Sequence, residues 1–147
     1  MLIKNKLTEV QKQLLPVKVR QFLWESQLKY NPEKFVYYTC QNVALGELKQ
    51  AKHDIWTNEE MSCYCLCKEE MDADGEKVYT AYQLFIEPEN RRLENVHKVI
   101  RFLRFYSQKQ GYKRLYVVSS RLDKVNAYAR GLGKKFLVKT VTFTEEL

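Results

Sequence analysis

The sequence predicts one α/β domain, built on a mixed, mostly antiparallel sheet with helices on both faces. The chain has 147 residues, which suits a single domain with a real core. Its composition is globular, with 45% hydrophobic residues and only 5 Gly and 3 Pro. A strand pattern, a long helical pattern and a second strand pattern follow one another in the last half, which predicts a crossover between two parallel strands.

Residues 1–34 form the predicted helical N-terminal part. Thr8 and Gln11 have the spacing of a capping box, and apolar residues then recur at helical intervals. Pro16 lies inside this pattern, so it either kinks the helix or marks its first turn. Asn31-Pro32 ends the segment, because a residue before proline disfavours the helical region.

Residues 35–87 predict an antiparallel meander. The run 35–40 (FVYYTC) is β-branched and aromatic, which favours a strand, and Asn42 then caps a helix that ends near residue 53. Ile55 and Trp56 begin a further strand. Two longer strands follow at 61–68 and 77–87, joined by a turn that contains Asp72 and Gly75.

Residues 88–147 predict a crossover helix followed by strand, helix and strand. Apolar residues recur every three or four positions over 90–110, and Gly111 ends that helix. A short buried strand follows at 115–119, then a helix from residue 120 and a last strand at 136–143. The strands at 77–87 and 115–119 should pair in parallel through a right-handed connection.

The net charge of the chain bears on which classes of partner it can bind. The net charge is +7, from 25 Lys and Arg against 18 Asp and Glu. These basic residues are spread along the chain, so they indicate a solvated surface and disfavour nucleic acid as the partner. The sequence shows no signal-peptide core and no run long enough to span a membrane, so we expect a cytoplasmic protein with reduced thiols and no membrane contact.

The cysteine and histidine residues do not have the sequence pattern of a metal site. Cys63, Cys65 and Cys67 alternate, which places all three on one face of a strand, and their spacing differs from a zinc knuckle. We expect buried thiols that face the helices. Of the two histidines, His97 follows the apolar Val96 and is expected at the surface or its boundary.

The order of elements over the last two thirds of the chain resembles the GNAT superfamily of acetyltransferases. In that family the fourth strand ends in a proline-containing turn, and the motif Arg/Gln-x-x-Gly-x-Gly/Ala opens the long helix. Here Ile86 and Pro88 match the turn and Arg91 matches the first motif position, whereas Glu94 and Val96 replace the two small residues.

The C-terminal part also carries the resemblance. Gly133 and Phe136 match the end of the family's fourth helix, and Tyr128 lies five residues before that glycine. This aromatic spacing is similar to shortened acetyltransferase-like proteins of tailed bacteriophages.

The resemblance implies acetyl-CoA as a cofactor and names candidate site residues. Arg91, Arg92 and Asn95 would bind the cofactor, Glu87 would be the base, and Tyr128 would protonate the leaving thiolate. Glu94 opposes this, because a carboxylate ~4 Å from a phosphate charge costs about 4 kcal/mol at an effective dielectric of ~20.

Three functions follow as hypotheses. The sequence favours a GNAT-fold protein with a degenerate acetyl-CoA motif that binds other proteins, as a phage assembly or host-interaction factor in the host cytoplasm or the virion. The first alternative is an active acetyl-CoA-dependent N-acetyltransferase. The second is a nucleic-acid-binding protein that uses the basic long helix. Acetyl-CoA and no cofactor stay open as equal alternatives, and no metal is expected.

Overall fold

The structure is a computed structural model, and it describes residues 2–26 and 28–118. In chain order its elements are β1 (Ile3–Lys4), α1 (Glu9–Ser26), α2 (Pro32–Glu47), β2 (His53–Thr57), β3 (Cys63–Met71), β4 (Lys77–Ile86), the 3-10 turn η1 (Pro88–Asn90), α3 (Leu93–Lys109) and β5 (Arg114–Val117).

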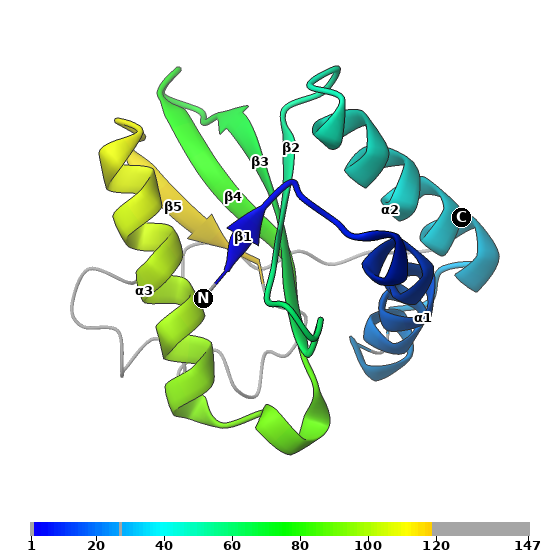
Figure 1. The fold of residues 1–147 in the computed structure, drawn as a ribbon. Coiled ribbons are helices and arrows are strands. Elements are labelled where there is room, and N and C mark those ends of the chain that lie inside the picture. The colour runs from blue at the N-terminus through cyan, green and yellow to red at the C-terminus, as the bar shows by residue number, and fades with distance from the viewer. Residues whose placement is uncertain (1, 27, 119–147) are drawn as a thin grey trace.

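The five described strands form one sheet in the order β1-β2-β3-β4-β5. All neighbouring pairs are antiparallel except β4 and β5, which are parallel and joined through α3. Helices α1 and α2 lie on one face of the sheet and α3 lies on the other (Figure 1). The predicted fold class and the parallel crossover are therefore confirmed.

Two apolar cores lie on the two faces of the sheet. The first packs between the sheet and α3, and its buried members are Trp56, Cys63, Cys65, Cys67, Tyr79, Ala81, Ile86, Val96, Val99, Ile100 and Leu103. The second packs against α1 and α2, and its buried members are Leu15, Val19, Val43, Ile55, Met61, Tyr64, Leu66 and Phe85. Each central strand supplies both cores because successive side chains point to opposite faces.

The start of α1 has the predicted capping box. The N–H of Thr8 donates to Oε1 of Gln11 at 2.9 Å, and the N–H of Gln11 donates to Oγ1 of Thr8 at 3.1 Å. The Gln11 amide also donates to the carbonyls of Asn58 and Glu59, which ties α1 to the loop after β2. Pro16 lies inside the helix, so the alternative that the helix begins there is wrong.

The predicted strand at 35–40 is wrong, because this run lies within α2. Asn31 caps α2 by accepting the N–H of Lys34 at 3.1 Å, and Pro32 occupies the first helical position. These two start signals outweigh the β-propensity of the run that follows. Asn42 is consequently an interior residue of α2 and not its cap, and the strands that follow α2 begin at β2.

The hairpin and the crossover helix agree with the prediction. Asp72 accepts the N–H groups of Asp74 and Glu76, and Gly75 adopts a φ of +75° in the turn. Gly111 follows α3 with a φ of +80°, as a C-terminal glycine should. Helix α3 begins at Leu93, three residues later than predicted, because η1 takes up the preceding residues.

The three β3 cysteines are buried and face α3, as predicted. The Sγ atoms of Cys65 and Cys67 lie 3.6 Å apart, and no group of three metal-binding side chains occurs within residues 2–26 and 28–118. The prediction that His97 lies at the surface or its boundary is wrong, because the residue is buried and only 7% exposed. It precedes the buried Ile100 by three positions and therefore lies on the sheet side of α3.

The remaining predictions fall on residues that the structure does not describe. These are the helix from residue 120, the strand at 136–143, and the family matches at Tyr128, Gly133 and Phe136. Among the described helices, none combines the length and the apolar character that a membrane span needs.

Candidate functional site

The parallel pairing of β4 with β5 ends one residue before a bulge in β4. Their parallel pairing runs from Val78 and Arg114 to Ala81 and Val117, and a last bond joins the N–H of Val118 to the carbonyl of Ala81 at 2.9 Å. At that point β4 bulges, because Leu66 pairs with Gln83 while Cys67 pairs with Ala81, leaving Tyr82 as the extra residue. Bulges are frequent beside active sites. The end of β4 and the start of α3 are therefore the candidate site.

The turn that leads from β4 into α3 is internally hydrogen-bonded. The N–H groups of Asn90, Arg91 and Arg92 donate to the carbonyls of Glu87, Pro88 and Asn90 at 2.9, 3.2 and 2.9 Å. A phosphate-binding turn must instead direct its N–H groups at the ligand. In the first turn of α3, the N–H groups of Asn95 and Val96 both donate to the carbonyl of Arg92, at 3.0 and 3.2 Å.

Arg91, the predicted cofactor ligand, is held by the protein itself. Its Nε donates to the carbonyl of Ile86 at 2.8 Å, and its guanidinium forms an ion pair with Glu25 of α1. The same guanidinium lies 5.9 Å from the centroid of Phe85. All of these groups belong to α1 and the end of β4, so Arg91 acts here as a link between them.

Glu87, the predicted base, is also paired. Its carboxylate forms an ion pair with Lys18 of α1, and the two side chains are only 13% and 18% exposed. A general base must offer a lone pair to the substrate. We call the Lys18–Glu87 and Glu25–Arg91 ion pairs the α1 clamp, because together they fix the turn after β4 to α1.

The other predicted cofactor residues are not gathered around one point. Arg92 is exposed and directly precedes α3, where its side chain caps nothing. The amide of Asn95 donates to the carbonyl of Asn90 at 2.7 Å. Glu94 is exposed, where its charge stabilises the start of α3, and Val96 is buried in the α3 core. Val96 thus replaces a small residue without obstructing the turn, whereas Glu94 puts a negative charge there.

A polar cluster that the sequence did not reveal lies on the α1/α2 face of the sheet beside the bulge. Nδ1 of His53 lies 3.1 Å from the hydroxyl of Tyr82, and the ammonium of Lys68 lies 5.2 Å from the Tyr82 ring. Lys68 also pairs with Glu70 at 3.1 Å, and Glu70 accepts the hydroxyl of Thr80 at 2.7 Å. The cross-strand pairing of His53 with Lys68 brings these groups together.

This cluster contains a neutral base. Burial, followed by the charge of Lys68, lowers the pKa of His53 below its ordinary value of 6.5. The hydrogen bond from Thr80 lowers the pKa of Glu70. His53 is therefore unprotonated at neutral pH and able to accept a proton. The sequence placed His53 at the end of a helix, whereas it begins β2 and its partners are supplied by two other strands.

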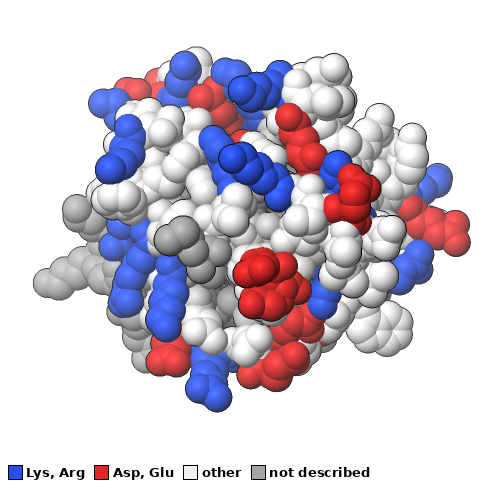
Figure 2. Space-filling model, in the orientation of Figure 1, with Lys and Arg blue, Asp and Glu red and all other residues white. Residues whose placement is uncertain are grey.

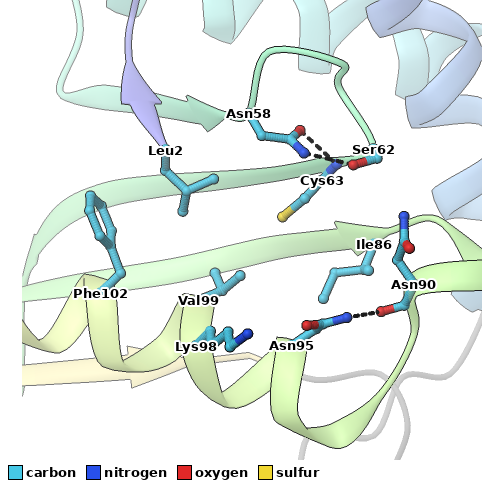
Figure 3. Close-up of a pocket in the computed structure, with 10 residues that line it drawn as sticks. All are labelled: Leu2, Asn58, Ser62, Cys63, Ile86, Asn90, Asn95, Lys98, Val99 and Phe102. Atoms are coloured by element: carbon cyan, nitrogen blue, oxygen red, sulfur yellow. Dashed lines mark hydrogen bonds between the residues drawn. The ribbon is translucent and has the colours of Figure 1, made fainter.

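A cavity of about 390 Å³ lies between α3 and the strand ends on the side away from β5 (Figure 3). Leu2, Val99 and Phe102 are among its apolar walls. Its polar end carries Ser62, Asn58, Asn90, Asn95 and Lys98. Of the predicted cofactor residues, Asn95 lines this cavity, whereas Arg91 and Arg92 do not.

Basic side chains are spread over the face of the molecule seen in Figure 2. Figure 2 shows basic side chains on the side of the molecule where α3 lies and acidic side chains interspersed over the rest of that face. Arg101 and Arg104 of α3 both already have interaction partners.

Comparison with known proteins identifies the fold. No family model and no curated protein matches the sequence. Solved structures do match, among them a probable acetyltransferase at a TM-score of 0.70 and 13% identity, covering 99% of both chains. An aminoglycoside acetyltransferase from an uncultured soil metagenomic sample matches at 0.68 and 12% identity, covering 100% of this chain and 95% of that one. The chain has the GNAT fold.

The fold alone does not decide the activity. A transcriptional regulator from Bacillus halodurans C-125 matches at a TM-score of 0.66 and 12% identity over the whole of both chains. Identities this low show a shared GNAT architecture and nothing finer, so the function must be argued from the residues of the site.

Proposed function

We propose that this chain is a GNAT-fold protein that acts by binding another protein, with its acetyl-CoA turn closed. The observation that supports the proposal is the set of contacts that Arg91 makes within the protein. The one motif residue that the chain retains is bonded to the carbonyl of Ile86 and paired with Glu25. It therefore serves the packing of α1 on β4, and a pyrophosphate would have to compete with Ile86 and Glu25 for its guanidinium.

The energies support a closed turn. Opening it would give up three backbone hydrogen bonds at about 0.5–1.5 kcal/mol each. Repulsion between Glu94 and a phosphate would add up to about 4 kcal/mol at ~4 Å, which its exposure allows it to reduce by turning away. A micromolar ligand binds with about 8 kcal/mol, so these costs together would weaken such a ligand to millimolar or beyond.

The outer side of α1 offers a surface for a protein partner. Val10, Val17 and Trp24 recur at intervals of seven residues, which places them on one stripe, and they are 66%, 62% and 86% exposed. Tyr37 and Tyr38 of α2 are also exposed. Tryptophan and tyrosine are the side chains that most often dominate binding energy at protein interfaces.

Capture with a matched pair of variants tests this proposal. The chain is immobilised, and bound proteins from its native cells are identified by crosslinking and mass spectrometry. Trp24→Ser should reduce recovery of the same partner at least tenfold, because it removes the largest exposed apolar side chain. Glu33→Ser, an exposed change on α2, should leave recovery unchanged. Equal recovery with both variants would contradict the proposal.

An active N-acetyltransferase is the second candidate. The bulge of β4 at Tyr82 supports it, together with the neutral His53 beside that bulge. Turnover of acetyl-CoA with a panel of primary amines tests it, with His53→Gln as the variant that should lose activity. A phage origin rests on Tyr128 and Gly133 and stays a prediction.

A further inference from the structure

The cavity beside α3 has the composition of a small-molecule site. Its volume of about 390 Å³ falls within the range of about 300–1,000 Å³ that such sites occupy. The side chains of Leu2, Val99 and Cys63 point into it, and the ring of Phe102 closes one end (Figure 3). These groups form an apolar wall that would hold a hydrocarbon chain or a ring.

The polar end of the cavity has hydrogen-bond donors that no acceptor among the described residues satisfies. Lys98 lines it, and its ammonium makes no hydrogen bond or ion pair with any residue in the described ranges. Ser62 accepts the amide of Asn58 at 2.6 Å, while its own hydroxyl proton has no acceptor among the described residues. The Asn95 amide donates one of its two N–H groups to the carbonyl of Asn90. An acceptor group on a ligand would satisfy these donors.

The charge of the side chains that line the cavity indicates which class of ligand would bind there. Among the described residues that line it, Lys98 is the one charged side chain, and Cys63 adds no charge because burial raises the pKa of its thiol to about 12. A cation would be repelled by Lys98 and by the net charge of +7. A phosphate dianion would be only half neutralised by one ammonium. A carboxylate matches both the single charge and the hydroxyl and amide donors.

We propose that this cavity binds a small amphipathic carboxylate, with its apolar part against Leu2, Val99 and Phe102 and its carboxylate toward Lys98 and Ser62. No residue of β5 is among the described residues that line the site, and it requires neither acetyl-CoA nor the protein partner. It is built from the start of the chain, the loop after β2 and one stripe of α3.

Tryptophan fluorescence can report occupancy. The ring of Trp56 lies edge-on to Phe102 with centroids 5.2 Å apart, so a ligand against Phe102 changes the surroundings of Trp56. Trp24 is exposed on the other side of the sheet, and Trp24→Phe removes its signal. The experiment uses the full chain with this change, titrated with octanoate and, separately, with 1-octanol as the uncharged probe.

The proposal expects saturable octanoate binding in the submillimolar range. Lys98→Met keeps the apolar stem and should weaken octanoate roughly threefold to tenfold while leaving 1-octanol unchanged. Lys29→Met, on the other side of the sheet, should change neither. Val99→Met fills the cavity and should weaken both probes, with its folding checked by thermal unfolding. Absence of saturable binding, equal affinity in the Lys98→Met chain, or insensitivity to Val99→Met would overturn the proposal.

Discussion

Replacing Arg91 by alanine separates a structural arginine from a cofactor ligand. The change removes the 2.8 Å bond from Nε to the Ile86 carbonyl and the ion pair with Glu25. A hydrogen bond from a charged donor contributes about 1.5–3 kcal/mol. The ion pair adds only about 0.5 kcal/mol, because its side chains are 29% and 25% exposed and solvent screens them. We therefore expect a loss of about 2–3 kcal/mol in the free energy of unfolding.

Urea unfolding followed by circular dichroism measures this loss. Arg92→Ala is the matched control, since Arg92 is the next residue, is exposed and caps nothing. It should change the free energy of unfolding by less than about 0.5 kcal/mol. If Arg91→Ala were as stable as Arg92→Ala, the α1 clamp would not stabilise the fold and the reasoning would be refuted.

Three further predictions concern α2 and the His53 cluster. Gly46→Ala should destabilise the protein by about 3 kcal/mol or more in thermal unfolding, because the new Cβ would lie 2.0 Å from the His53 carbonyl oxygen. The control Ala44→Ser, at an exposed position of the same helix, should leave the stability nearly unchanged. Asn31→Ala should cost about 1 kcal/mol through the lost cap of α2, and a loss near zero in urea unfolding would show that the cap is unimportant. The lowered pKa of His53 means that the unfolded state binds its proton more tightly, so the stability this group confers is present above pH 6.5 and is lost as the pH falls through the folded pKa. His53→Gln should flatten the unfolding free energy against pH in that range, and an unchanged slope would contradict the assignment.

Local sequence signals predicted most of the described fold. The capping box of α1, the Asp-Gly turn before β4 and the glycine after α3 each depend on neighbouring residues, and the structure has all three. The strand predicted at 35–40 failed because two local signals competed. The cap at Asn31 with Pro32 starts a helix, and its packing against the sheet then outweighs the β-propensity of the following residues.

The candidate site was harder to predict because its contacts join distant parts of the chain. Lys18 and Glu87 are 69 positions apart, and Glu25 and Arg91 are 66 apart. The motif resemblance predicts that Arg91 binds phosphate, but only the packing of α1 shows that this arginine has another partner. The His53 cluster likewise depends on the register of β2 with β3, which periodicity does not determine.

The most direct test of the closed turn is a titration of the purified protein with acetyl-CoA, by calorimetry and by thermal shift. The account predicts no saturable heat and no stabilisation up to millimolar ligand, because the turn donors and Arg91 are already bonded. Micromolar binding would contradict it. At a hundredfold excess over the dissociation constant, such binding would stabilise the protein by about 2.7 kcal/mol, which a thermal shift readily detects.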